Sequence, residues 1–245
     1  FIHDFKYIFG GGQVEAGHIA GALPTLNGVF GEDIFKIVDK YHPGGPYFVA
    51  EFYPAWFDVW GQRHSTVDYK RPAEQLDWML GQGVSVSMYM FHGGTNFWYM
   101  NGANTAGGYR PQPTSYDYDA PLGEWGNCYP KYYAFREVIQ KHLPHGTVLP
   151  EVPADNPTTT FATIELKESA PLQAAFHQTT ESENVLSMED LGVDFGYIHY
   201  QTTINKAGKQ KLIIQDLRDY AVILVDGKQV ASLDRRYNQN NVMLD

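Results

Sequence analysis

The chain has 245 residues, of which 43% are hydrophobic, so it can bury one large core or two modest ones and lies outside the disordered class. Its formal net charge of −10, with Lys and Arg dispersed, provides no basic stripe for nucleic acid. Its apolar runs are far shorter than the roughly 20 residues that cross a bilayer. Its single cysteine, Cys128, excludes a disulfide within the chain. We therefore expect a globular protein that binds neither nucleic acid nor membrane.

The first half of the chain alternates between helical and strand patterns. Apolar residues at helical spacing predict helices at 31–41 and 65–80. Short apolar, aromatic and β-branched runs predict strands at 46–53 and 84–91, and a further helix is predicted at 131–141. This order indicates βα units around a parallel sheet.

Between about residues 144 and 160 the composition shifts to Pro, Thr and Gly, which is typical of a domain boundary. We therefore predict two domains, 1–150 and 151–245. The second contains strand-like runs and an Asp226-Gly227 dipeptide that fits a hairpin turn, so it is predicted to be an antiparallel β-sandwich. The predicted strands are 195–204, 211–215, 221–225 and 229–233.

Glu51 is a carboxylate near the C-terminal end of an apolar predicted strand. Burying such a group is costly unless it is paired, hydrogen-bonded or used in chemistry. Parallel α/β folds keep their chemistry at the C-terminal ends of strands, so Glu51 is a candidate catalytic residue. The alternative is a structural glutamate bonded to an arginine or to backbone.

The next predicted strand ends in an aromatic and glycine-rich run, 89–97, and its loop continues to a Tyr- and Asp-rich run, 113–119. Two neighbouring strand ends would then face one cavity lined by a carboxylate, phenols and indoles, which suits a sugar. For Asp117 and Asp119, the capping of turns is favoured over a catalytic role.

Other chemistries find less support in these residues. Gly93-Gly94 lacks the flanking pattern of a phosphate-binding loop. The nine histidines show no paired spacing of metal ligands, so we expect hydrogen-bonding or surface roles for them and no metal. No organic cofactor is expected either.

Three segments in the same order, residues 47–61, 89–104 and 113–122, closely resemble the β-galactosidases of glycoside hydrolase family 35. Residues 193–200 and 219–222 resemble the β-domain that follows the barrel in that family. The resemblance implies an α/β plus all-β fold: the C-terminal portion of a (β/α)8 TIM barrel followed by an antiparallel β-sandwich.

The resemblance also implies roles for individual residues. Glu51, in a Glu-Phe-Tyr motif, would be the nucleophile of a retaining reaction that releases terminal β-D-galactose. Tyr53, Trp56, Tyr89 and Tyr118 would line the galactose pocket. The residues expected to shape or brace that pocket are Phe91, Asn96, Tyr116 and Asp117.

A retaining hydrolase needs a second carboxyl group as acid and base. In this family it is a Glu directly after an Asn, upstream of the nucleophile, and these 245 residues contain no Asn-Glu dipeptide. Glu15 and Glu32 have other neighbours, so the role is transferred to neither. Because only about a third of a (β/α)8 barrel is represented, we expect the chain to be a fragment, with the acid/base residue in the part that precedes it.

Two alternatives stay open, the first from a different function class and the second an enzyme with a different substrate. One is a non-catalytic protein that binds galactosides, and the other is an exo-β-glycosidase for another sugar. The expected partner is a β-galactoside or glycan, and a homo-oligomer is compatible with the sequence. The compartment is left open, although the absence of an Asn-x-Ser/Thr acceptor favours a bacterial cytoplasmic or exported protein over a lysosomal one.

Overall fold

The computed structural model describes residues 2–5, 18–176 and 178–244. Contacts along the chain divide it into two compact units. The first contains residues 1–97 and 112–158, and the second contains residues 98–111 and 159–245. The predicted domain boundary between residues 150 and 151 stays a prediction.

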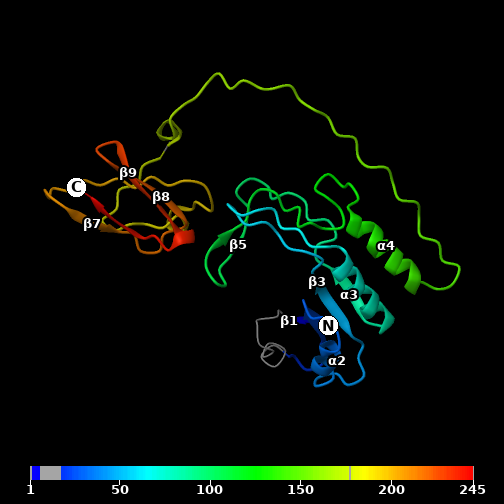
Figure 1. The fold of residues 1–245 in the computed structure, drawn as a ribbon. Coiled ribbons are helices and arrows are strands. Elements are labelled where there is room, and N and C mark those ends of the chain that lie inside the picture. The colour runs from blue at the N-terminus through cyan, green and yellow to red at the C-terminus, as the bar shows by residue number, and fades with distance from the viewer. Residues whose placement is uncertain (1, 6–17, 177, 245) are drawn as a thin grey trace. The chain divides into compact units, whose positions relative to one another are not determined.

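The first unit is built on a four-stranded sheet in which neighbouring strands run parallel in the order β1-β2-β3-β4. Helix α2 connects β2 to β3, and α3 connects β3 to β4, so the predicted βα units are present (Figure 1). The strands are β1 (Ile2–Phe5), β2 (Leu23–Asn27), β3 (Phe48–Phe52) and β4 (Ser85–Met88), and the helices are α2 (Asp33–Val38), α3 (Lys70–Gly81) and α4 (Pro130–His142).

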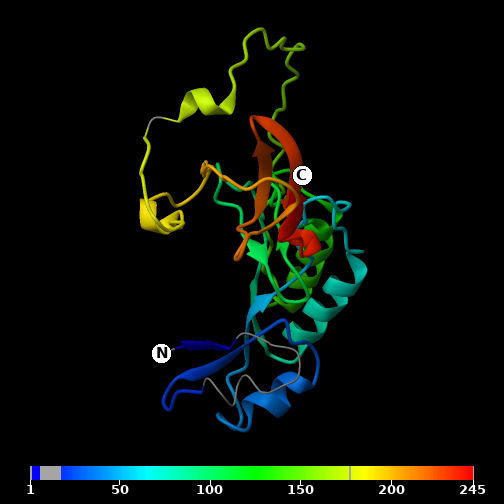
Figure 2. The ribbon, with the colours of Figure 1, turned by 90° about the vertical axis from the view of Figure 1, so that its left-hand side faces the viewer.

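Helices α3 and α4 lie side by side in both views (Figure 1, Figure 2). Asp77 on α3 accepts hydrogen bonds from the Lys141 ammonium at 2.7 Å and the His142 ring at 2.6 Å. These hydrogen bonds hold the pKa of the Asp77 carboxyl below its usual value. Asp77 therefore fixes the C-terminal end of α4 against α3.

The core of this unit lies between the sheet and its helices. Val49 and Phe52 from β3 pack with Leu76 and Met79 from α3, and Phe135 reaches the same cluster from α4. Each is at most 1% exposed. The apolar face of α3 is thereby buried against the strand that carries Glu51.

We expect Leu76→Ala to lower the free energy of unfolding by about 2–5 kcal/mol, because it leaves a cavity in this core. Denaturant unfolding of the variant measures the change. Leu166→Ala is the matched control, since Leu166 is 91% exposed and its truncation should change stability by no more than about 0.5 kcal/mol. Equal losses in the two variants would contradict this description of the core.

Several predicted element ends were wrong. Helix α3 begins at Lys70 and not at Ser65; the residues before it form a loop in which the backbone N–H groups of Ser65 and Val67 donate to the side chains of Asp58 and Asp119. Strand β4 ends at Met88, after which the backbone N–H of Tyr89 still donates to β3 but the chain turns away. Helix α2 has six residues, Asp33–Val38, and does not extend over the predicted range 31–41.

The second unit contains only short antiparallel pairs among its described residues. Strand β10 pairs with β7, β8 with β9, and β5 with β6. The predicted turn at Asp226-Gly227 is confirmed, since both residues have positive φ between β8 and β9. The strands are β5 (Ala103–Asn104), β6 (Arg110–Pro111), β7 (Gln210–Ile213), β8 (Tyr220–Val225), β9 (Lys228–Asp234) and β10 (Asn241–Leu244).

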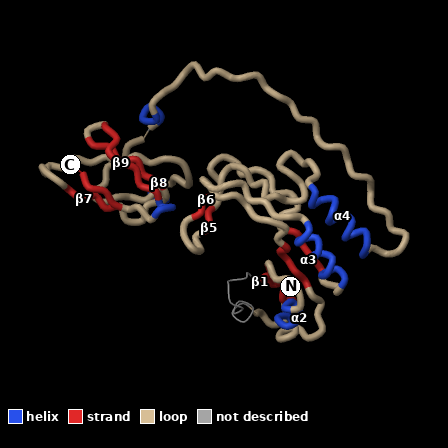
Figure 3. Tube along the Cα trace, viewed as in Figure 1, coloured by secondary structure: helices blue, strands red, loops and turns tan. Residues whose placement is uncertain are grey.

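The strand predicted at 195–204 was wrong. Most of the chain between α4 and β7 is loop (Figure 3), and no described strand pairs with residues 195–204. Phe195 and Tyr197 instead contact the ring of Tyr99, at 5.9 Å and 6.2 Å between ring centroids. The aromatic residues of this segment therefore take part in ring packing and not in a sheet.

Candidate active site

The carboxyl ends of β2, β3 and β4 meet at one edge of the parallel sheet. Glu51 on β3 is the register partner of Asn27 on β2, and its carbonyl accepts a hydrogen bond from the Gly28 N–H at 2.9 Å. On the other side, the Tyr89 N–H donates to the carbonyl of Phe52 at 2.9 Å. Glu51 thus occupies the central one of three adjacent strand ends, where α/β enzymes hold their catalytic groups.

The Glu51 carboxylate is oriented by Tyr53, the residue that directly follows β3. The Tyr53 hydroxyl donates to Glu51 Oε2 at 2.6 Å, which is a short, charge-assisted distance. Both side chains are part-buried. An oriented and accessible carboxylate of this kind is suited to attack an electrophilic carbon.

The four residues expected to line the pocket form one aromatic cluster. The Tyr53 ring lies edge-on to Trp56 at 5.4 Å and to Tyr89 at 6.4 Å between centroids. Tyr118 contacts Trp56 at 6.1 Å and Tyr89 at 5.9 Å. Three segments of the chain, up to 65 positions apart in sequence, are thereby brought together beside Glu51, with flat apolar faces and phenolic hydroxyls that suit a sugar.

Tyr118 has the most unusual environment in this cluster. It is 1% exposed, has a positive φ of 65°, and its buried hydroxyl finds no hydrogen-bond partner among the described residues. Burial raises the pKa of Tyr118, and the neighbouring tyrosines and Glu51 raise it further. A buried phenol without a hydrogen-bond partner is unusual in a folded protein, so Tyr118 is a candidate for binding an external group.

The four bracing residues are placed around this cluster unequally. Tyr116 joins it, with its hydroxyl 3.4 Å from that of Tyr89, and burial followed by this hydrogen bond raises its pKa. Asn96 donates to the carbonyl of Pro113 at 3.1 Å, which fixes the base of the loop. Asp117 is 7% exposed and accepts from the Tyr129 hydroxyl. Phe91 packs on Tyr132 instead.

Two glycines near the site were missed by sequence reasoning. A Cβ on Gly28, which has φ 65°, would lie 2.7 Å from the Tyr53 ring. A Cβ on Gly93 would lie 1.9 Å from the carbonyl oxygen of Tyr116. Both positions need glycine, because a side chain would collide with the Tyr53 ring at position 28 and with the Tyr116 backbone at position 93.

Sequence reasoning also missed Lys131, which is buried in the structure at 2% exposure. Its ammonium donates to the Asp119 carboxylate at 2.5 Å and to the Asp119 carbonyl at 2.6 Å. Asp119, with φ 47°, directly follows Tyr118. A lysine within an amphipathic helix gives no sequence signal that it will be buried.

No group of three or more His, Cys, Asp or Glu side chains that could hold a metal ion occurs among the described residues. None of the helices that the structure describes is long and apolar enough to cross a membrane. Glu15 lies outside the described residues, and Glu32 precedes α2.

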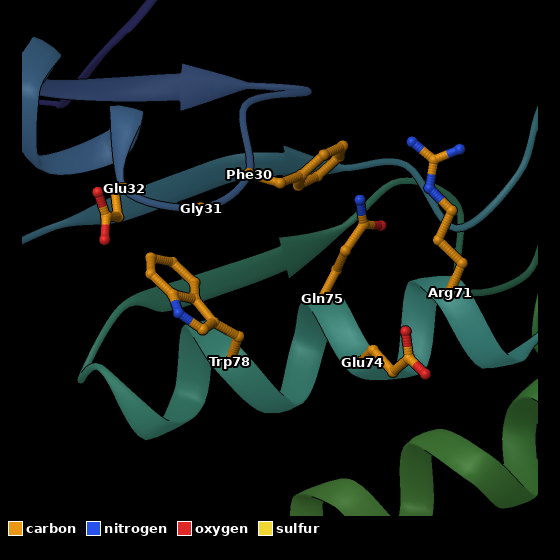
Figure 4. Close-up of a pocket in the computed structure, with 7 residues that line it drawn as sticks. All are labelled: Phe30, Gly31, Glu32, Arg71, Glu74, Gln75 and Trp78. Carbon is orange, nitrogen blue, oxygen red and sulfur yellow. The ribbon is translucent and has the colours of Figure 1, made fainter.

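A groove of about 410 Å³ lies away from Glu51. Phe30, Gly31 and Glu32 line it from the segment between β2 and α2, and α3 supplies the other side (Figure 4). The residues from α3 are Arg71, Glu74, Gln75 and Trp78. None of these side chains belongs to the aromatic cluster, so the groove is separate from the candidate active site.

Comparison with known proteins assigns the two parts of the chain. Residues 12–142 match "Glycosyl hydrolases family 35", and residues 185–245 match "Beta-galactosidase, first all-beta domain". A Xanthomonas manihotis β-galactosidase is 39% identical over 94% of this chain and 39% of its own length. The Mus musculus β-galactosidase is 36% identical over 96% and 39%, and the human one 35% identical over 94% and 35%.

The fold and the site define a glycosyl hydrolase domain of the α/β type followed by an all-β domain. The chain belongs to glycosyl hydrolase family 35. It spans about two fifths of the length of the relatives named above.

Proposed function

We propose that this chain supplies the nucleophile and one wall of the galactose pocket of a retaining β-galactosidase. The observation that carries the proposal is the Glu51 carboxylate, held at the end of β3 by the Tyr53 hydroxyl at 2.6 Å and surrounded by the aromatic cluster. Three similar proteins that carry the name β-galactosidase support galactose as the sugar.

In the proposed reaction an oxygen of ionised Glu51 forms a bond to the anomeric carbon while the bond from that carbon to the leaving oxygen breaks. An acid outside these residues protonates the leaving oxygen. The same group then takes a proton from water, whose oxygen displaces Glu51 and releases β-galactose. Both steps invert the carbon, so the configuration is retained overall.

Each part of the cluster has a function in this mechanism. Tyr53 orients the carboxylate throughout, because its hydroxyl bonds to one carboxylate oxygen. Tyr118 offers its buried hydroxyl to a sugar hydroxyl, and Trp56, 40% exposed, offers a ring face to the apolar side of the sugar. The four parallel strands are proposed to be consecutive strands of a (β/α)8 barrel, and the all-β domain a β-sandwich.

The test is a panel of 4-nitrophenyl glycosides supplied to the full-length protein. We expect hydrolysis of the β-galactoside and little of the β-glucoside or N-acetyl-β-glucosaminide. Proton NMR of the first product should show the β-anomer before mutarotation. Preference for another sugar would replace galactose in the proposal, initial formation of the α-anomer would remove double displacement, and galactoside binding without hydrolysis would show a non-catalytic protein.

A further inference from the structure

Two loops that are connected to the aromatic cluster also contact each other through polar side chains. The first, residues 58–67, follows Trp56 and Phe57, and the second, residues 115–119, carries Tyr116 and Tyr118. His64 lies between them. Its Nδ1 is 2.8 Å from Asp58 Oδ2 in its own loop, and its Nε2 is 3.7 Å from Asp117 Oδ1 in the other.

A second set of contacts closes the same two loops. The backbone N–H of Ser65 donates to Asp58 Oδ1 at 2.7 Å, and that of Val67 donates to Asp119 Oδ2 at 2.6 Å. Three carboxylates therefore hold the segment around His64. Two of them, Asp117 and Asp119, are the residues immediately before and after Tyr118.

The chemistry of the imidazole decides what His64 contributes. An ionised carboxylate only accepts hydrogen bonds, so Nδ1 carries a proton toward Asp58. In the neutral ring, Nε2 then presents a lone pair to Asp117, whereas in the imidazolium it presents an N–H and a positive charge. Only the cation attracts both loops.

The backbone of the turn at Tyr118 and Asp119, which the two loops hold, is strained. Tyr118 and Asp119 both have positive φ, at 65° and 47°, a region that costs non-glycine residues energy unless surrounding contacts enforce it. Asp117 accepts from the Asp119 N–H at 3.1 Å inside the same turn. Contacts on Asp117 and Asp119 therefore bear directly on where the Tyr118 ring lies.

We propose that His64, in its imidazolium form, is a positioning residue that joins the Asp58 loop to the Asp117 turn and so holds Trp56 and Tyr118 in place for the galactoside. This role rests on the proposed function. His64 makes no hydrogen bond, ion pair or ring contact with the four described cluster residues, so we assign its effect to the two loops.

The charges around His64 favour the cation. The hydrogen bond to Asp58 raises the pKa of His64 most, and the charges of Asp58, Asp117 and Asp119 add to this while partial burial opposes it. Beyond these groups, Lys131 pairs with Asp119, and the Tyr129 hydroxyl donates to Asp117. As pH rises through this raised pKa, the positive charge between the loops disappears, while the ion pair of Lys131 with Asp119 remains.

The sign of the pH dependence follows. The folded-state pKa of His64 is above the ordinary value, so its contribution is complete below the ordinary pKa near 6.5 and is lost as pH rises through the folded value. Sugar binding should weaken over the same range.

The experiment compares the full-length wild type with His64→Gln, which is neutral at every pH, using 4-nitrophenyl β-galactoside between pH 4 and pH 9. The quantity is the wild-type to variant ratio of kcat/KM at each pH, because titrations of the catalytic groups cancel in it. We expect a ratio of roughly 10 to 100 at acidic pH, mostly in KM, that falls toward one above the pKa of His64.

Two further variants sharpen the result. His64→Arg keeps a positive charge at every pH, so its kcat/KM relative to His64→Gln should stay raised at alkaline pH. His145→Gln changes an exposed histidine in the turn after α4 and should give a ratio of one throughout. Melting temperatures recorded alongside show that the variants are folded.

Direct binding of isopropyl β-D-thiogalactoside, which is not hydrolysed, gives a reading without turnover. The wild-type Kd should rise with pH through the same range and the His64→Arg Kd should not, even if His64→Gln fails to fold. A constant ratio of kcat/KM, or parallel pH profiles of Kd, overturns the role of His64 while wild-type hydrolysis leaves the proposed function standing. A wild type that neither binds nor hydrolyses β-galactosides overturns both.

Discussion

The Glu51→Gln variant of the full-length protein should lose at least about 10⁴-fold in kcat on β-galactosides. The amide has nearly the same shape as the carboxylate and still accepts the hydrogen bond from Tyr53, so the aromatic cluster should stay in place. The amide oxygen carries no negative charge, however, and cannot form the bond to the anomeric carbon. Initial rates with 4-nitrophenyl β-galactoside measure the loss.

Glu74→Gln is the matched control, since Glu74 is an exposed glutamate on α3 in the same unit. It should keep wild-type kcat and KM. The Kd of Glu51→Gln for isopropyl β-D-thiogalactoside should remain close to the wild-type value. Hydrolysis at the wild-type rate by Glu51→Gln would remove Glu51 from the chemistry.

Lys131→Met should lower the free energy of unfolding by about 3–5 kcal/mol, because it leaves the Asp119 carboxylate partly buried without its cation. Two hydrogen bonds, to the carboxylate and the carbonyl of Asp119, are lost together. Methionine retains most of the apolar stem of lysine, so the loss reflects the charge and not a cavity. Urea unfolding monitored by tryptophan fluorescence measures it.

Lys36→Met tests whether any lysine would behave in the same way. Lys36 pairs with Asp33 at 3.0 Å, but both side chains are 67% exposed, so removing the pair should have little effect on stability. Lys131→Met should also raise KM, because Asp119 supports the strained backbone at Tyr118. A Lys131→Met variant as stable as Lys36→Met would show that Asp119 does not depend on this cation.

The parallel α/β part could be predicted where the sequence pattern and the tertiary contacts agree. Strand β3 and helix α4 each have a dense apolar face that packs in the core, so periodicity located them within two residues at either end. Strand β2 was not predicted. It contains Pro24, and a proline argues against a strand because it has no backbone N–H to donate to a neighbouring strand. Its burial depends on β1 and β3, which are distant in sequence.

The site could be predicted only in part, for reasons that concern single residues. Glu51 is conspicuous because a carboxylate interrupts an apolar strand, and the Tyr and Trp residues near it were found through family resemblance. The positions of Lys131, His64 and Gly93 depend on loops folding back over 12 to 53 residues, as the contacts of Lys131 with Asp119 and of His64 with Asp117 show. Local patterns carry no information about such returns.

In the all-β part, the sequence predicted a strand that the structure does not contain. Residues 195–204 are rich in the aromatic and β-branched residues that favour strands, yet strand formation requires a partner for the backbone N–H and C=O groups. In the described part of the chain, their rings pack on Tyr99 and the Tyr200 hydroxyl donates to the carbonyl of Leu186. Pairing between distant segments, and not propensity, decides which β-like runs become strands.

The central claim concerns which oxygen bonds to the sugar. Incubating the full-length protein with a 2-deoxy-2-fluoro-β-galactoside that carries an activated leaving group should trap the glycosyl-enzyme, and peptide mapping by mass spectrometry should find the fluorosugar on Glu51. A fluorosugar attached to any other residue would contradict the account.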